Sequence, residues 1–260
     1  MSVRDTMTKK TAISAPNLLE QTRLEIAVAS RLLTGEGVLG YSGHVSFRIL
    51  EPSGLLIQPA NVSRAAVNPE QILFCDFDGN VVEGPENCRP PSEIFIHTEI
   101  YRTRHNVNAI AHFHPEISTV FTLVEGVELR PMKGHATRWA GGIPVHPDPG
   151  HVDSPVLGRY LAETLGNCNA ALMRAHGVVV VAESVPAVMV DVIHFEENAV
   201  AAFHAIQIGQ AKPLTDAEIE IFVSRFKRES HIRKLWAYYV SRGFAAGTLP
   251  KIWENRLTAL

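Results

Sequence analysis

Three histidines in two short apolar segments offer the chemistry of a metal site. His112 and His114 stand two residues apart at the end of the segment 109–115, and in a strand that spacing directs both side chains to one face. His176 ends a second apolar segment, just before Gly177, and neighbouring strands of one sheet would bring it to the same point. Three imidazoles with an open coordination position let a divalent cation act as a Lewis acid. The pattern predicts a catalytic metal site, although each segment taken alone is also compatible with a structural role.

A carboxylate in an unusual setting strengthens this interpretation. Within Pro90–His97, Glu93 falls in the first turn of a predicted helix, and it shares one helical face with Ile96, His97 and Ile100. An acid on a mostly apolar face is uncommon, although an acid in a first turn also complements the helix dipole. Together with the histidines, its position predicts that Glu93 lies beside the metal.

The residues that must position these groups form alternating hairpins and helix-to-strand units. Turn signals at 51–54 and at Asp78-Gly79 predict two hairpins. The expected helices are 24–35, 92–104 with Ser92 as its cap, 154–165, 186–208 and 215–242, and the expected strands are 44–50, 55–58, 71–77, 80–83, 107–113 and two within 170–182. This order predicts an α/β domain with a mixed, largely antiparallel sheet covered by helices.

The length and composition indicate one main domain with short appendages. The chain has 260 residues, of which 46% are hydrophobic and 20% charged, enough for one sizeable core. We expect a flexible polar lead at 1–16, a catalytic domain at 17–212 and a helical extension at 213–260.

The charge and the cysteines exclude several classes of partner. A formal net charge of −3 provides no broad basic field, so we expect a small-molecule substrate and no nucleic acid. The three cysteines are widely separated with no C-x-x-C pair, which is typical of a reducing cytosol. No apolar signal segment and no run of 18 apolar residues occurs, so we expect a cytoplasmic protein without a membrane span.

Four motifs resemble those of the class II aldolase/adducin family across roughly residues 20–210. They are SGHVSFR (42–48), DGNVVEG (78–84), PPSEIFIHTEIYRTRHNVNAIAHFHP (90–115) and LMRAHGVVV (172–180).

The resemblance implies a role for each candidate residue. It implies that His112, His114 and His176 bind one divalent metal ion per subunit, Mn²⁺ or Zn²⁺, and that Glu93 is the metal-adjacent acid/base. It also implies a three-layer α/β/α fold and a homotetramer with active sites at subunit interfaces. The identity of the metal stays open, because imidazole and carboxylate ligands accept several ions.

The sequence departs from the sugar-phosphate members of that family where they gather a phosphate. His44 stands in place of an asparagine, Gln58–Asn61 in place of a threonine-glycine turn, and Pro91 in place of the first of two serines, which leaves Ser92. Proline offers a phosphate oxygen neither an N–H nor a hydroxyl. The sequence is therefore more similar to the metal-dependent aromatic decarboxylase branch, whose substrates are hydroxylated aromatic or pyridine dicarboxylates.

These residues predict a carbon–carbon lyase, with decarboxylation through a metal-stabilised enolate favoured. Glu93 is the expected proton shuttle. His44 is a further catalytic candidate that could hydrogen-bond a substrate carboxylate, and Ser92 is a candidate substrate contact. An aldolase that cleaves a non-phosphorylated hydroxy-keto acid or a sugar phosphate is the alternative, and a non-enzymatic adducin-like scaffold is a remote one.

Other polar and aromatic groups have open roles. The loops 133–138 and 146–151 have the composition of segments that reach over a site, and Arg64 and Arg138 could each pair with a second carboxylate. We expect packing roles for His194 and His204. An aromatic cluster on the last helix could pack within the chain or against a neighbouring subunit; it comprises Arg233, Trp236, Tyr238 and Tyr239.

Overall fold

A single eight-stranded sheet runs through the computed structural model, which describes residues 15–257. The strand order is β4-β3-β2-β1-β5-β8-β7-β6. The strands are β1 His44–Ile49, β2 Gly54–Ile57, β3 Leu73–Cys75, β4 Val81–Glu83, β5 Ala109–Phe113, β6 Val145–His146, β7 Ala170–Met173 and β8 Gly177–Ala182. Every neighbouring pair is antiparallel except β6 and β7. The predicted mixed, largely antiparallel sheet and both predicted hairpins are confirmed.

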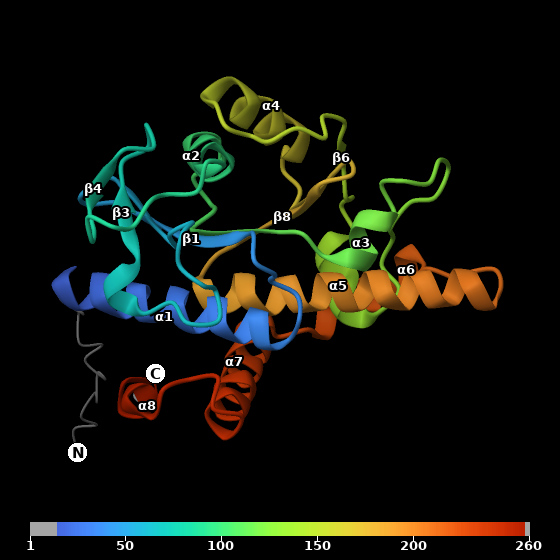
Figure 1. The fold of residues 1–260 in the computed structure, drawn as a ribbon. Helices are drawn as coiled ribbons and strands as arrows, with labels where there is room; N and C mark the ends of the chain where they lie inside the picture. The colour runs from blue at the N-terminus through green and yellow to red at the C-terminus, as the bar shows by residue number, and fades with distance from the viewer. Residues whose placement is uncertain (1–14, 258–260) are drawn as a thin grey trace, which may run out of the picture.

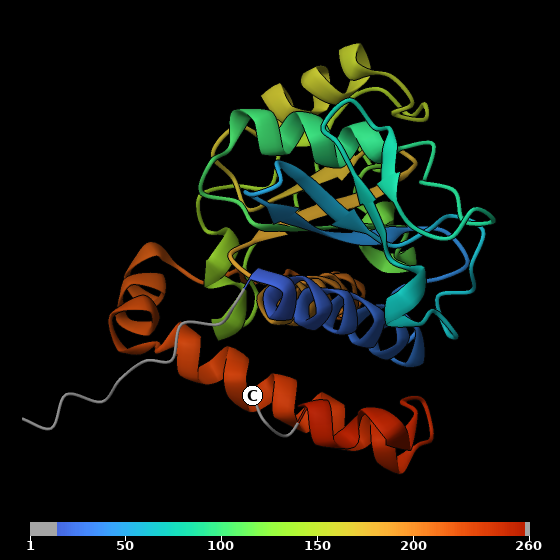
Figure 2. The same cartoon turned by 90° about the vertical axis from the view of Figure 1, so that its left-hand side faces the viewer.

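Helices cover both faces of the sheet. On one face lie α2 Ile94–Thr103 and α4 Pro155–Leu165, and on the other α1 Ala15–Gly35, α3 Glu116–Val120 and α5 Val185–Ile208 (Figures 1 and 2). Two buried clusters of apolar side chains fill the spaces between the layers. The three-layer α/β/α fold is therefore confirmed.

The pairing register of the central strands β1, β5 and β8 determines which side chains meet at the site. β5 and β8 are buried along their whole length, because helices cover the sheet on both sides. His44 of β1 pairs with His112 of β5, and His112 pairs in turn with Val179 of β8. His44 and His112 thus meet at one end of the sheet.

Several helix starts follow local capping rules. The side chain of Ser154 accepts a hydrogen bond from the N–H of Leu157 at the start of α4, and Thr215 forms a capping box with Glu218. The expected cap at Ser92 is wrong, because α2 starts two residues later and Glu93 occupies the N-cap position without a side-chain cap bond. The Glu93 carboxylate is turned to other partners instead.

The C-terminal segment forms several helices where the sequence predicts one over 215–242. α6 Asp216–Arg225 and α7 Arg228–Ala245 are separated at Phe226, whose backbone is extended. The extended backbone of Phe226 cannot continue the helix. Its ring packs against Phe222 and His231, with ring centroids 5.1 and 5.0 Å away. α7 then lies against α1 and α5 on the outside of the domain (Figure 2).

Short helices complete the described chain. They are the 3₁₀ helices η1 Pro69–Gln71, η2 Gly134–Trp139 and η3 Lys251–Trp253, and the last helix α8 Glu254–Leu257. Within residues 15–257, no helix is long and apolar enough to cross a membrane. The flexible lead predicted for 1–16 lies outside the described residues except for its last two, which begin α1.

Close packing of α4 on α2 holds α2, and with it Glu93, against the sheet. A β-carbon at Gly158 of α4 would lie 2.5 Å from the carbonyl oxygen of Phe95 and 2.8 Å from Cγ of Glu99. We expect Gly158→Ala to lower the free energy of unfolding by about 1–3 kcal/mol, because the helices must separate to accept the methyl group. Urea denaturation measures the change. Gly141→Ala is the control, since nothing lies within 4 Å of that position, and equal stability losses in the two variants would contradict the packing argument.

Candidate metal centre

Two strand ends deliver the three histidines to one point. His112 is in β5 and His114 follows directly after it, while His176 lies in the tight turn between β7 and β8. Gly177 closes this turn, where a β-carbon would lie 2.5 Å from the carbonyl oxygen of Phe113 and 3.4 Å from Cε1 of His112. Glycine is required here because the turn passes directly over the end of β5.

The four predicted groups come together. Nε2 of His112 lies 3.1 Å from Nε2 of His114. The Glu93 carboxylate reaches between the rings, with one oxygen 3.4 Å from Nε2 of His112 and the other 3.4 Å from Nε2 of His176. One donor atom from each of the four residues lies within 4.8 Å of all the others.

Backbone carbonyls orient two of the rings. Nδ1 of His112 donates to the carbonyl oxygen of Val178 at 3.0 Å, and Nδ1 of His176 donates to that of Gly150 at 3.1 Å. A carbonyl can only accept, so each neutral ring carries its proton on Nδ1 and presents the Nε2 lone pair to the cluster. This arrangement is typical of metal-binding histidines. Nδ1 of His114 is buried without a partner among the described residues.

The charges in the cluster depend on one another. Burial opposes ionisation of Glu93, but the imidazoles of His112 and His176, which donate to the carboxylate when protonated, outweigh it and hold its pKa well below the ordinary value. Burial lowers the pKa of His176, yet Glu93 more than compensates and the net shift is upward. Burial and the neighbouring histidines lower the pKa of His114 to about 3.

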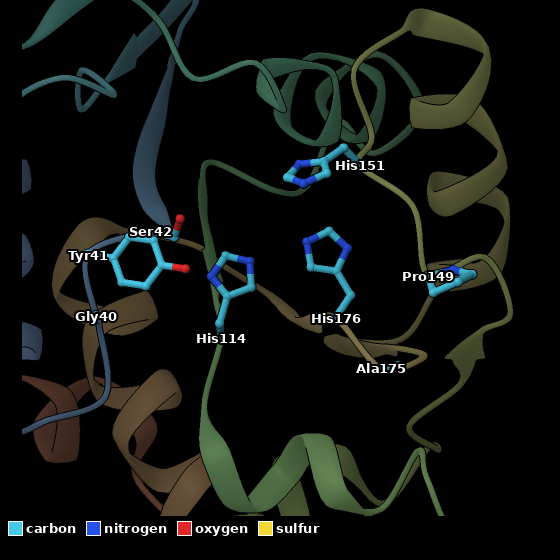
Figure 3. Close-up of a pocket in the computed structure, with 8 residues that line it drawn as sticks. All are labelled: Gly40, Tyr41, Ser42, His114, Pro149, His151, Ala175 and His176. Carbon is cyan, nitrogen blue, oxygen red and sulfur yellow. The ribbon is translucent and has the colours of Figure 1, made fainter.

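The donor set fits a divalent cation. Three imidazole nitrogens and one ionised carboxylate suit zinc, manganese and related ions. The rings of His114 and His176 are nearly parallel at 7°, with centroids 5.1 Å apart, and they lie side by side in Figure 3. The centroids are too far apart for close ring contact, and the donor atoms of the four residues stay within 4.8 Å of one another, close enough to share one ion.

An open pocket of about 330 Å³ lies directly over the cluster. Its lining is Gly40, Tyr41, Ser42, His114, Pro149, His151, Ala175 and His176 (Figure 3). The loop 146–151 reaches the site as its composition suggested, and Nδ1 of His151 lies 3.7 Å from the Glu93 carboxylate. The N–H of Val152, just beyond this loop, donates to Glu93 at 3.1 Å.

Sequence reasoning missed one aromatic residue of the pocket. Tyr41 is 94% exposed at the pocket mouth, and its ring points toward His114 (Figure 3). An exposed tyrosine beside a glycine has no distinguishing sequence pattern. Only its position over the cluster shows that it belongs to the pocket.

The two predicted substrate contacts lie in different surroundings. His44 is 3% exposed, and its ring centroid is 5.2 Å from that of His112. Ser92 is exposed, and neither residue is among those that line the pocket. Both roles remain predictions.

Two arginines that could have bound a carboxylate are engaged within the protein. Arg64 donates to the carbonyl oxygens of Gly43 and Ala60 at 3.1 and 2.6 Å. Arg138 pairs with Asp191 at 3.3 Å. The loop 133–138 packs against α5 and α6 instead of the pocket.

Two residues of the predicted aromatic cluster on α7 pack within the chain. Trp236 and Tyr239 belong to the larger apolar core, at 7% and 8% exposure, whereas Tyr238 is 52% exposed. His194 of α5 is buried, and His204 is exposed.

A second histidine group lies between η2, α5 and α7 but is a poor metal site. His135, His194 and Glu197 have donor atoms within 4.8 Å. The two imidazoles, however, are stacked face to face, with centroids 4.0 Å apart and planes 17° apart. An ion cannot lie in both ring planes of such a stack, so these rings serve packing.

The fold and the cluster together define an α/β protein with a candidate catalytic metal centre. The model of the family "Class II Aldolase and Adducin N-terminal domain" matches residues 24–203. The chain belongs to this family, and it is an enzyme of the class II aldolase superfamily.

Relatives with assigned activities include decarboxylases and aldolases. The 3,4-dihydroxyphthalate decarboxylases of Rhodococcus jostii and Arthrobacter keyseri are 30% and 32% identical, covering 74% and 76% of this chain and 83% and 84% of their own. Sugar-phosphate aldolases match at lower identity. The structure of L-fuculose 1-phosphate aldolase from Glaciozyma antarctica aligns with a TM-score of 0.79 at 18% identity, over 92% of this chain and 95% of that one.

Removing either histidine of the H-x-H pair tests the metal centre. We expect His112→Ala and His114→Ala to lose most of the bound metal, because each leaves two imidazoles in place of three. Elemental analysis of the purified protein, after loading with Mn²⁺ or Zn²⁺ and dialysis, measures the stoichiometry. His204→Gln, on the exposed side of α5, should retain the metal. Unchanged metal content in both alanine variants would contradict the assignment.

The stacked histidines predict acid sensitivity of the fold. Burial, with Lys133 and His231, lowers the pKa of His135 to about 4, and burial, with His135, His231 and Arg228, lowers that of His194 to about 3. The unfolded histidines titrate near pH ~6.5, so below that pH the unfolded chain binds more protons and stability falls.

We expect His194→Gln to reduce the stability lost between pH 7 and pH 5 by about 1–2 kcal/mol relative to wild type. Urea denaturation at both pH values measures this difference. Both proteins contain the metal centre, so its contribution to the pH dependence is the same in each and does not affect the difference. The exposed variant His204→Gln should follow wild type. A pH dependence unchanged by His194→Gln would show that this stack does not control acid stability.

Proposed function

We propose that the protein is a divalent-metal-dependent decarboxylase of a hydroxylated aromatic or pyridine dicarboxylate. The observation that carries the proposal is the convergence of the buried Glu93 carboxylate and three imidazole rings at the base of an open pocket. The 3,4-dihydroxyphthalate decarboxylases at 30% and 32% identity support the class of substrate.

A bound divalent cation would supply a Lewis acid that stabilises negative charge on a substrate oxygen. We assign it to His112, His114 and His176, with Glu93 adjacent, and we propose Mn²⁺ or Zn²⁺ as the ion. The carbonyl oxygens of Val178 and Gly150 hold two of the rings in the required tautomer.

Glu93 is suited to carry the proton that the reaction consumes. When the carboxylate leaves as carbon dioxide, the bond to the ring carbon breaks and its electron pair stays on the ring, so the carbon must gain a proton. The N–H of Val152 fixes one oxygen of Glu93, and His151 lies between that oxygen and solvent. His151 is 75% exposed in its side chain and provides a route by which Glu93 is reprotonated from water.

An aldolase is the second candidate, because the same cluster serves both reactions and aldolases are among the relatives. The surroundings favour decarboxylation. Pro91 offers no donor, the N–H of Ala60 is bonded to the carbonyl oxygen of Arg89, and Arg64 is committed to backbone carbonyls. A substrate phosphate would find few free donors there. A non-enzymatic scaffold would not require the complete cluster.

We also propose a homotetramer in which a neighbouring subunit covers the open mouth of the pocket. The exposed Tyr41 at that mouth supports this arrangement, because large apolar surface beside a site is often covered by a partner. Light scattering of the metal-loaded protein measures the assembly.

Replacing the acid tests the chemistry. We expect wild type with Mn²⁺ to release carbon dioxide from 3,4-dihydroxyphthalate or a hydroxypyridine dicarboxylate, and Glu93→Gln to lower kcat by about 10²–10⁴-fold, because an amide cannot shuttle the proton. Carbon dioxide release is measured together with metal content, which the three histidines should retain.

Glu116→Gln, at an exposed position after β5, is the matched control and should keep full activity. Activity of Glu93→Gln equal to that of this control would rule out the shuttle. Cleavage of a hydroxy-keto acid without release of carbon dioxide from any dicarboxylate would establish the aldolase instead.

A further inference from the structure

A buried line of hydrogen bonds leads away from the metal cluster into the protein. Nδ1 of His44 lies 2.6 Å from Nε2 of His97, and Nδ1 of His97 lies 2.6 Å from Oγ of Ser46. Oγ of Ser46 lies 2.8 Å from the hydroxyl of Tyr101, which donates to the carbonyl oxygen of Asn108 at 3.2 Å. All four side chains are at most 3% exposed.

Matching periodicities of a strand and a helix build this line. His44 and Ser46 are two residues apart on β1 and point to the same face, while His97 and Tyr101 are four apart on α2 and form one helical ridge. The polar side chains of the helix therefore lie against the polar face of the strand. Such a satisfied polar network in an apolar interior holds its members in one arrangement.

The acceptor at the Asn108 end of the line determines which atom donates in each of its hydrogen bonds. The carbonyl oxygen of Asn108 can only accept, so the single hydroxyl proton of Tyr101 points to it. Ser46 then donates to the Tyr101 oxygen and accepts from Nδ1–H of His97. Nε2 of His97 is left as an acceptor and receives Nδ1–H of His44.

We infer that this line holds His44 in the tautomer whose Nε2 is unprotonated, so that His44 accepts a hydrogen bond from a hydroxyl group of the substrate. His97, Ser46 and Tyr101 are positioning residues that act through His44. The substrate part of this inference rests on the proposed function, since a hydroxylated ring supplies the donor.

The surroundings of His44 agree with this assignment. Its Nε2 has no hydrogen-bond partner within residues 15–257, and its ring adjoins that of His112 at 5.2 Å between centroids. An unprotonated Nε2 repels a carboxylate and attracts a hydrogen-bond donor. The inference therefore replaces the carboxylate contact expected from the sequence with a hydroxyl contact. Burial, which lowers the pKa of His97 to about 3, keeps that ring neutral with one proton.

The hydrogen bonds of the line fix the tautomer of His44; they do not conduct protons. A proton passed along it would reach Tyr101 and then a backbone carbonyl that cannot take it up. Its effect is therefore to exclude the other tautomer of His44, which would turn an N–H toward the substrate.

The tautomer is measured directly by nitrogen-15 NMR of the zinc-loaded protein with labelled histidine, where unprotonated and protonated ring nitrogens resonate far apart. His44→Gln assigns the signals. We expect Nε2 of His44 to be unprotonated. A protonated Nε2 in wild type would overturn the inference.

Removing the Tyr101 hydroxyl should reverse the donor and acceptor roles in the remaining hydrogen bonds. In Tyr101→Phe, the Ser46 hydroxyl loses its acceptor and satisfies its proton by donating to Nδ1 of His97, because an unsatisfied buried donor is costly. His97 then donates to His44, and Nε2 of His44 becomes protonated. The control Thr98→Val removes a buried hydroxyl without a partner from the same helix and should keep the wild-type tautomer. An unchanged tautomer in Tyr101→Phe would overturn the positioning role.

Two probes test the hydroxyl contact without requiring turnover. Catechol, which offers ring hydroxyls, should shift the Nε2 signal of His44, whereas phthalate, which offers only carboxylates, should not. A shift with phthalate alone, or none with catechol, would overturn the contact even if decarboxylation is observed. If the tautomer and the catechol shift hold but no dicarboxylate is decarboxylated, the proposed reaction fails and the inference about His44 stands.

In an active enzyme, we expect Tyr101→Phe to lower kcat/KM by about tenfold, the value of one lost hydrogen bond.

Discussion

Three imidazole rings surround one buried carboxylate, and two of their ring nitrogens lie so close together that a proton or a cation must lie between them. Nε2 of His112 and Nε2 of His114 are only 3.1 Å apart, and Nδ1–H of His112 is already committed to a carbonyl. Without a cation, His114 donates its Nε2–H to Nε2 of His112. The attraction between Glu93 and the neighbouring imidazoles lowers the pKa of Glu93 and raises that of His176. A divalent cation satisfies all four donors at once, so the arrangement is best explained as a centre built for a metal.

The sheet makes this crowding possible. The antiparallel register between β1 and β5 places His44 opposite His112, and the turn before β8 folds back over the end of β5. A slip of one residue would turn the polar side chains of β1 to the opposite face. Helix α2 contributes twice, with Glu93 at its start and with His97 and Tyr101 along the ridge that faces β1.

The two histidine groups show that composition alone does not make a metal site. His114 and His176 line an open pocket, and their centroids are 5.1 Å apart. His135 and His194 are instead stacked in close contact between η2 and α5, with centroids 4.0 Å apart. One group therefore supports chemistry, and the other supports attachment of the C-terminal helices.

Local patterns in the sequence determined much of this protein. The two-residue spacing of His112 and His114, the Ser154 and Thr215 caps and the hairpin turns follow from strand alternation and short-range hydrogen bonding, which need no distant partner. Tertiary structure decided the rest. Contacts between segments far apart in the chain bring His176 to Glu93, carry His151 to the site on its loop and place the exposed Tyr41 over the pocket. The direction of the His44 line depends on the Asn108 carbonyl, which no side-chain pattern reveals.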